Sequence, residues 1–345
     1  MPAPQVIPYG EVTLNITAEV MSHPRDLSKV LATRYGVSRA TSANVLRRLE
    51  TEGWVSRSGP STHPVFTPGY KRSRTFSRPL PGLEEDKVWE DDVAPYLLLT
   101  SNVRNIVHHG FTEMVNNAID HSEGKQVLVH VLQDQSKVEL LVSDDGIGIF
   151  RKISEAMQLP DVRLAMFELA KGKLTTDPSK HSGEGVFFTS RMFDDFGIHA
   201  NGLYFSHEDQ APRDWLLDAA ARPGTAVHMR IAVNSARTSR EVFEQYMNAP
   251  EDYGFNKTVV PMKLAQLGSD QLLSRSQAKR LIARFDRFRT VMLDFSGVPE
   301  IGQAFADEIF RVYARQHPNV ELVPYHMTEQ VERMWRRALR SDVAS

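Results

Sequence analysis

Four polar residues recur at every fourth position of a stretch whose apolar residues have helical spacing. This stretch is 101–122, and the polar residues are His109, Glu113, Asn117 and His121. A four-residue spacing places all of them in one row on one face of a helix. A buried row of imidazole, carboxylate and amide groups is costly unless it binds something. We therefore expect this helix to line a ligand site.

Three glycine-containing motifs follow this helix. The β-rich runs 126–134 and 137–150 alternate apolar and polar residues, and the second contains Asp144-Asp145-Gly146-Ile147-Gly148. Farther on, Gly183-Glu184-Gly185-Val186 opens an expected helix to about residue 194, and Gly224-Thr225 precedes a strand. Each signal is weak alone, since a DxGxG motif after a strand is usually a turn. Their order and spacing together indicate a single site.

This set of motifs resembles the GHKL family of ATP-binding domains, which includes gyrase, histidine kinases and anti-sigma-factor kinases. The resemblance covers roughly residues 95–235. Glu113-x-x-x-Asn117-Ala118-x-x-His121 looks like the N box of that family. Asp144-x-Gly146-x-Gly148 and Gly183-x-Gly185 look like its two glycine boxes. The resemblance implies a domain that binds ATP and Mg²⁺.

The residue types suit the roles that the resemblance implies. Asn117 offers the hard oxygen ligand that Mg²⁺ prefers, and Glu113 can take a proton from an attacking water as the catalytic residue. Asp144 would accept a hydrogen bond from the adenine amino group, with Thr225 in its water network. Glycines let the backbone approach the nucleotide, and free N–H groups at a helix start hold phosphate oxygens. The expected nucleotide-binding residues are Asn117, His121, Asp144, Gly146, Gly148, Lys180, Gly183, Gly185, Val186 and Thr225.

The segment between the glycine boxes, roughly 150–182, resembles the ATP lid of the family. It contains Lys171, Lys173 and Lys180, and we expect one of them to contact phosphate. His121 is expected to order the end of its helix. The second glycine box is shorter than in histidine kinases, and no upstream helix with a phosphoacceptor histidine is found. Autophosphorylation is therefore disfavoured.

The N-terminal part predicts two helices and a hairpin. Residues 26–35 are amphipathic and end at Gly36, and Ser38 can cap a second helix with a buried stripe. Extended pieces at 54–55 and 63–66 follow. Residues 27–59 resemble the winged helix-turn-helix regulators, whose second helix enters the major groove of double-stranded DNA. The resemblance implies contacts to bases and phosphates from outward-facing positions. These positions are Ser38, Arg39, Thr41, Ser42, Asn44, Arg47 and Arg48.

The C-terminal part alternates strands and helices, which predicts a small α/β layer domain. A basic amphipathic helix is expected over 274–288. Residues 274–318 resemble the STAS-like domains, relatives of the anti-anti-sigma factors. Those factors carry a phosphorylatable serine where this chain has Ile301-Gly302-Gln303-Ala304, and Ser296 is expected to serve a turn. We therefore predict an interaction module, with Gly302 and Gln303-Ala304-Phe305 as a surface for a partner protein or for the ATP domain.

Charge and composition limit which partners and which kinds of site are possible. The 345 residues carry a net charge of −2, but residues 1–80 are basic, with 11 Lys/Arg against 5 Asp/Glu. Residues 81–235 are acidic, with 14 against 24. Such asymmetry favours a nucleic-acid partner for the basic part. The chain has no cysteine, which excludes disulfides and thiolate zinc sites. No apolar run spans a membrane, so a cytoplasmic protein is expected.

The fold class expected is α+β multidomain. It comprises a winged helix over 1–82, a GHKL (Bergerat) α/β sandwich over 83–240 and a small STAS-like α/β domain over 250–345. The composition at 57–82 is that of a loop or linker. The leading hypothesis is an ATP-responsive DNA-binding transcription regulator, a slow Mg-dependent ATPase. The alternatives are an anti-sigma-type or histidine protein kinase and a scaffold with a degenerate pocket. Relatives of this fold often dimerise, which leaves a homodimer open by analogy alone.

Overall fold

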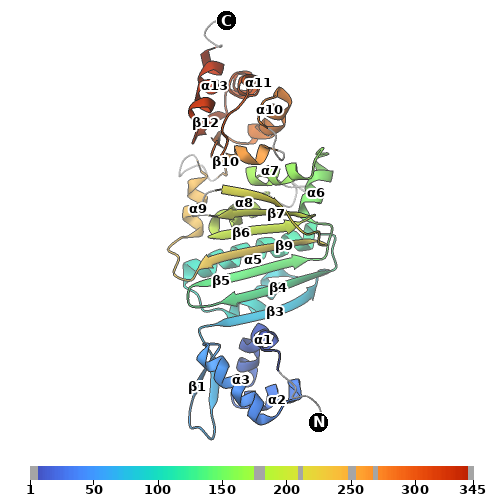
Figure 1. The fold of residues 1–345 in the computed structure, drawn as a ribbon, viewed down its shortest axis with the longest axis vertical. Helices are drawn as coiled ribbons and strands as arrows, with labels where there is room; N and C mark the ends of the chain where they lie inside the picture. Colours follow the sequence, from blue (N-terminus) through green and yellow to red (C-terminus); the bar gives the residue numbers. More distant parts are fainter. Residues whose placement is uncertain (1–6, 175–182, 209–212, 248–253, 267–270, 341–345) are drawn as a thin grey trace. The chain divides into compact units, whose positions relative to one another are not determined.

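The computed structural model describes residues 7–174, 183–208, 213–247, 254–266 and 271–340 (Figure 1). The fold is α+β. The chain divides into two compact units. The first unit contains residues 1–146 and 224–236, and the second contains residues 147–223 and 237–345. In the described parts of the chain, no helix combines the length and the apolar character that crossing a membrane requires.

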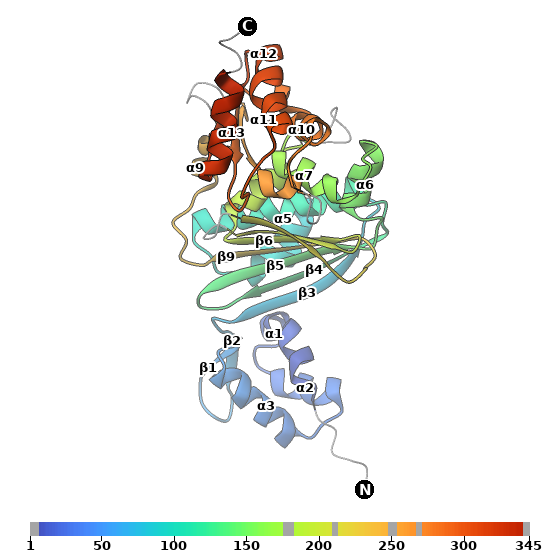
Figure 2. The same cartoon turned by 45° about the horizontal axis from the view of Figure 1, so that its top comes forward.

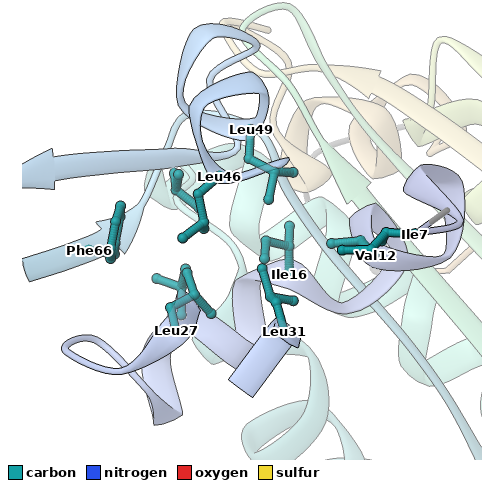
Figure 3. Packing of buried hydrophobic residues seen from close by; sticks show 10 residues of the cluster. Ile7, Val12, Ile16, Leu27, Leu31, Leu46, Leu49 and Phe66 are labelled. Carbon is teal, nitrogen blue, oxygen red and sulfur yellow. The ribbon is translucent and has the colours of Figure 1, made fainter. Parts of the chain in front are cut away.

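The chain begins with three helices and a two-stranded hairpin. Helices α1 (Tyr9–Ser22), α2 (Leu27–Tyr35) and α3 (Arg39–Thr51) precede strands β1 (Val55–Ser58) and β2 (Val65–Pro68), which pair antiparallel. The two predicted helices and the hairpin are confirmed, whereas helix α1 was not foreseen. Apolar side chains from all of these elements form one core (Figure 3), which includes Val12, Ile16, Leu27, Leu31, Leu46, Leu49, Val55 and Phe66.

The two signals that predicted the turn between α2 and α3 are both present. Gly36 has φ 63°, a left-handed conformation that glycine adopts without steric cost and that ends α2. The Ser38 hydroxyl accepts a hydrogen bond from the Thr41 N–H at 3.1 Å and so caps α3. Local sequence therefore determines where α2 ends and where α3 begins.

Residues 57–82 were expected to form a loop or linker, and this prediction is wrong for part of the segment. Residues 72–79 form strand β3 (Arg72–Pro79), which pairs antiparallel with β4 (Gln126–Gln133) along its whole length. Helix α1 is hydrogen-bonded to this strand, since the buried Ser73 N–H donates to the Thr17 hydroxyl at 2.9 Å. Strand β3 thus lies before the boundary expected at 82 and yet belongs to the sheet that follows.

The sheet of the first unit has the strand order β3-β4-β5-β9 and is antiparallel throughout. Strands β5 (Lys137–Asp144) and β9 (Thr225–Ala232) join the pair just described. The predicted alternation is confirmed, since every second side chain is buried: Val127, Val129, Val131, Val138, Leu140 and Val142. After the short helices α4 (Glu85–Val88), η1 (Trp89–Val93) and η2 (Ala94–Tyr96), helix α5 (Ser101–His121) packs against β5 and β9.

The second unit begins with helices α6 (Ile149–Ala156), α7 (Arg163–Lys171) and α8 (Gly185–Met192). An antiparallel meander of β6 (Asp195–Ala200), β7 (Leu203–Glu208) and β8 (Arg213–Asp218) follows, then helix α9 (Ser239–Gln245). Every side chain of α7 from Leu164 to Lys171 is buried. A helix buried all round lies inside a domain rather than at its surface.

The C-terminal part is the α/β layer domain that was predicted (Figure 2). Its three strands are parallel in the order β10-β11-β12, and they are β10 (Lys257–Pro261), β11 (Thr290–Asp294) and β12 (Glu321–Tyr325). The helical elements are η3 (Met262–Ala265), α10 (Arg275–Ile282), η4 (Phe285–Arg287), a continuous stretch α11–η5–α12 (Gln303–Gln316) and α13 (Glu329–Arg340).

One predicted helix of this domain is shorter than expected. The expected basic helix 274–288 ends at Ile282, because Ala283 leaves the helical conformation, with ψ 131°, and Arg284 is left-handed, with φ 67°. Non-glycine residues seldom adopt a left-handed conformation unless neighbouring contacts hold them there.

Candidate nucleotide-binding site

The polar row on α5 lies as predicted. His109, Glu113, Asn117 and His121 are all half-buried on the helix that packs against β5 and β9. Burial lowers the pKa of His109, and the neighbouring His108 lowers it further, so its neutral form is favoured. The Asn117 amide and the Glu113 carboxylate therefore lie in a partly desolvated environment, as the groups of a ligand site do.

Asp144 stands at the end of β5 and is held by backbone groups on two sides. Its Oδ1 accepts hydrogen bonds from the Gly146 N–H at 2.8 Å and from the Thr225 N–H at 3.1 Å. The Gly224 N–H donates to the Gly146 carbonyl at 2.7 Å, so the start of β9 is tied to the same turn. The structure thus brings together Asp144, Gly146 and Thr225, which lie up to 81 positions apart.

Two glycines are required here by the packing of the protein itself. A Cβ at Gly146 would lie 2.0 Å from the Ser122 carbonyl oxygen, just past the end of α5. A Cβ at Gly224, which has φ 65°, would lie 2.0 Å from the Asp144 carbonyl oxygen. We expected these glycines to let the backbone approach a nucleotide. In the structure they let segments of the chain itself approach one another closely. This close approach fixes the end of α5 relative to Asp144.

Asp145, the neighbour of Asp144, has a different role. Its Oδ1 accepts hydrogen bonds from the Lys125 N–H at 2.7 Å and the Gln126 N–H at 3.0 Å. These bonds favour the charged carboxylate and lower the pKa of Asp145. Asp145 therefore braces the start of β4.

In the second unit, Gly148 is the N-cap of α6, with φ 88°. A Cβ there would lie 2.4 Å from Oδ1 of Asn201, a residue that belongs to none of the predicted motifs. The Asn201 side chain accepts from the Arg151 N–H at 3.0 Å and donates to the Ile147 carbonyl at 2.9 Å. Asn201-Gly202 forms the turn between β6 and β7, and this Asn-Gly pair was the signal available in the sequence.

The second glycine box opens helix α8, as predicted. Gly183 has φ 72°, and α8 begins at Gly185, followed by Val186. The Gly183 carbonyl accepts a hydrogen bond from the Leu174 N–H at 2.9 Å. Lys180 lies outside the described residues. Of the other lysines expected in the lid, Lys171 is fully buried in an ion pair and thus holds protein rather than a ligand.

The residues expected to contact DNA are exposed or half-buried, with the exception of Ser42. Arg39, Asn44, Arg47 and Arg48 are exposed on α3, Ser38 is its cap, and Thr41 is half-buried. Ser42 is a correction to the prediction: it is fully buried, with its hydroxyl 2.9 Å from that of Ser28, because its helical position faces α2.

Arg48 has protein contacts. Its Nε donates to Glu52 at 2.8 Å, and its guanidinium lies 3.7 Å from the centroid of the Tyr9 ring.

In the C-terminal domain, the expected contact surface is smaller than predicted. Gln303 and Ala304 are exposed, but Phe305 is fully buried in the core. The turn role expected of Ser296 is confirmed, since its N–H donates to Asp294 Oδ1 at 2.9 Å.

Comparison with known proteins identifies two of the domains. Residues 102–208 match the family model of histidine kinase-, DNA gyrase B- and HSP90-like ATPases. Residues 277–332 match a STAS-like domain of unknown function. No curated protein matches the chain. Among solved structures, the chain is similar to an IcIR transcriptional regulator from Alicyclobacillus acidocaldarius at 14% identity, covering 69% of this chain and 95% of that one, with a TM-score of 0.19. The chain thus contains a GHKL-type ATPase domain and a STAS-like domain.

Proposed function

We propose that this protein is an ATP-responsive, DNA-binding transcription regulator whose ATPase domain is the switch. The observation that carries the proposal is the fixation of Asp144 by two backbone N–H groups, next to the glycine turn that contacts the end of α5. A carboxylate held in this way keeps its orientation, as the recognition of an amino group requires.

The residues of this site fit an adenine nucleotide with Mg²⁺. The side-chain oxygen of Asn117 would hold the metal ion, which supplies charge neutralisation to the phosphates. Glu113, one turn away on the same half-buried face, would take the proton of the attacking water. Asp144 would accept from adenine, with Thr225 beside it. In the second unit, taken by itself, the start of α8 after Gly183 has the N–H groups that suit a phosphate.

The DNA-binding half of the proposal rests on the N-terminal helices and on the basic charge of residues 1–80. Exposed Arg39, Asn44 and Arg47 lie on α3, the second helix of a helix-turn-helix order. Helix α1 is bonded to β3, the edge strand of the sheet that carries Asp144. This hydrogen-bonded connection supports the proposal that a change at the nucleotide site would reach the N-terminal helices through the sheet. ATP would shift the DNA-binding state by no more than its differential affinity for the two states.

The experiment is a titration of operator DNA with and without Mg-ATP. We expect ATP to change the DNA affinity of the wild type by about 5- to 150-fold, the usual range of allosteric coupling. Glu113→Ala should bind ATP, respond to it and fail to hydrolyse it. Asn117→Ala, the control, should lose both nucleotide binding and the response. Identical DNA affinity with and without ATP would refute the proposal, and transfer of the γ-phosphate to protein would support the kinase alternative instead.

A further inference from the structure

Helix α7 of the ATPase domain is embedded in the STAS-like domain. It packs against β10 and against the short helix η3 that follows that strand. The Thr258 hydroxyl on β10 is fully buried and donates to the Lys171 carbonyl at 2.7 Å. The last turn of α7 therefore has its partners in the C-terminal domain, more than eighty residues away in sequence.

Three charged side chains form a buried network at this turn. Glu168 accepts from the Lys171 ammonium at 2.6 Å and from the Arg284 guanidinium at 2.8 Å. Lys171 is fully buried and also donates to the Ala283 carbonyl at 3.0 Å. Breaking a buried charge network by removing one member is strongly destabilising, because the remaining charges lose their compensation. The network therefore specifies one arrangement of α7 against residues 283–284.

Arg284 contributes more than its charge. Its guanidinium donates to the carbonyls of Gly172 at 2.7 Å and of Lys173 at 2.6 Å, the two residues that follow α7. A cation at this place donates hydrogen bonds to the carbonyl groups that a helix leaves at its C-terminus. It also interacts favourably with the negative end of the helix dipole. Arg287 adds a bond of 3.1 Å to the Lys173 carbonyl. The left-handed backbone of Arg284 is the conformation that accompanies these contacts.

The residues held by Arg284 lead directly to the second glycine box. Leu174, next to Lys173, donates its N–H to the Gly183 carbonyl at 2.9 Å. The contact is close, since a Cβ at Gly183 would lie 2.4 Å from the Leu174 carbonyl carbon. Gly172 is equally confined, because a Cβ there would lie 2.6 Å from the Phe255 ring. A displacement of residues 172–174 would therefore be passed on to Gly183 and to the start of α8.

We propose that Arg284 of the STAS-like domain is a positioning residue for the phosphate-binding glycine box of the ATPase domain. It holds the carbonyls of Gly172 and Lys173, and through Leu174 it sets the place of Gly183. A residue of the STAS-like domain thereby positions a glycine box of the ATPase domain in the same chain. Any partner that displaces the turn 283–287 would weaken phosphate binding. This inference rests on the proposed ATP binding.

The test compares Arg284→Ala with Arg280→Ala, which removes the same charge from an exposed position of α10. Hydrogen exchange of the Leu174 amide reports the position of the loop without any nucleotide. We expect exchange about tenfold or more faster in Arg284→Ala and unchanged in Arg280→Ala. The affinity for ATP should fall about tenfold or more, while that for adenosine, which has no phosphates, stays the same.

Two further variants separate positioning from folding. Arg284→Lys keeps the charge but lacks the planar fork, so it should recover only part of the ATP affinity. Arg287→Ala, which removes a single exposed contact, should shift the same amide and the same ATP affinity by a smaller factor and remain folded if Arg284→Ala does not. Unchanged Leu174 exchange in both Arg284→Ala and Arg287→Ala would overturn the inference, and so would equal losses of ATP and adenosine affinity. Absence of ATP binding in the wild type would refute the proposed function alone, because the exchange comparison needs no nucleotide.

Discussion

Adjacent aspartates at the end of β5 show how position, rather than residue type, decides a role. Asp144 points its Oδ1 at the N–H groups of Gly146 and Thr225, whereas Asp145 accepts from Lys125 and Gln126. Asp144 is the last residue of β5 and Asp145 the first residue beyond it, so the two side chains meet different surroundings. One carboxylate therefore belongs to the candidate site and the other to the β4 junction.

Asp144→Asn tests the adenine-recognition role with little change of shape. The amide oxygen can still accept from Gly146 and Thr225, so we expect the free energy of unfolding to stay within about 1 kcal/mol of the wild type. The amide nitrogen donates where the carboxylate accepted, so the affinity for ATP should fall at least about tenfold. Calorimetric titration and urea unfolding measure both quantities. Unaltered ATP affinity would show that Asp144 does not recognise adenine.

At the scale of elements, α3 carries two kinds of arginine. Arg48 is engaged with Glu52 and the Tyr9 ring, so it joins α3 to α1. The Tyr9 hydroxyl donates to the same Glu52 carboxylate at 2.8 Å. Arg39 is exposed at the first turn of the helix. The helix thus has one face that stabilises the domain and another face that is exposed, which is the face proposed to contact DNA.

Arg39→Ala should weaken DNA binding without weakening the fold. We expect about tenfold lower affinity for the operator and stability within about 0.5 kcal/mol of the wild type. If Arg39 contacts phosphate, the slope of log affinity against log salt should also fall by about 1. Arg48→Ala should instead lower the melting temperature. A lower melting temperature for Arg39→Ala, with DNA affinity preserved, would reverse this assignment.

The pairing of β3 with β4 should respond to pH through His130. Its Nδ1 lies 2.8 Å from the Thr75 hydroxyl on β3, and burial lowers its pKa below the ordinary 6.5, although Glu139 opposes the shift. The unfolded chain therefore binds a proton before the folded one does as the pH falls. The resulting stability is present above pH 6.5 and is lost below it, with a slope of at most about 1.4 kcal/mol per pH unit for this proton.

Urea unfolding between pH 5 and 8 tests this expectation. His130→Gln should reduce the slope of stability against pH. His63→Gln, the same change at an exposed position of the hairpin loop, serves as the control. An unreduced slope in His130→Gln would show that other groups dominate the acid response.

For the molecule as a whole, the connection between α1 and β3 is the route by which the nucleotide site would reach the helices proposed to bind DNA. The Thr17 hydroxyl accepts from the Ser73 N–H, and the Asn15 side chain accepts from the Thr75 N–H at 3.3 Å. Because both donors are backbone groups of β3, the contact depends on the path of the strand.

Thr17→Val removes one of these acceptors and leaves the buried Ser73 N–H without it. We expect a loss of about 1–3 kcal/mol in stability and a smaller effect of ATP on DNA affinity. Thr13→Val, whose hydroxyl bonds only locally to the Gly10 carbonyl, is the matched control. Unfolding and operator titration of both variants decide the matter. An undiminished ATP response in Thr17→Val would place the coupling elsewhere.

Much of the architecture could be predicted from local patterns. Helix α5, strands β4, β5 and β9, the turn between α2 and α3 and the alternating C-terminal elements lie where periodicity and capping residues placed them. The loop composition of 57–82 concealed β3, because arginine and serine are tolerated on a strand whose stability comes from β4, about fifty residues later. Helix α1 was missed, although its buried residues have helical spacing.

The motifs and their order, and with them the ATPase and STAS-like domains, could be recognised without a structure, because motifs and periodicities are properties of neighbouring residues. The roles of individual polar residues became visible in the folded chain. Ser42 and Lys171 are buried, Asn201 lies against Gly148, and Arg284 reaches α7 from another domain. These contacts join segments far apart in the chain. A residue's partner there depends on how elements pack, which no local pattern records.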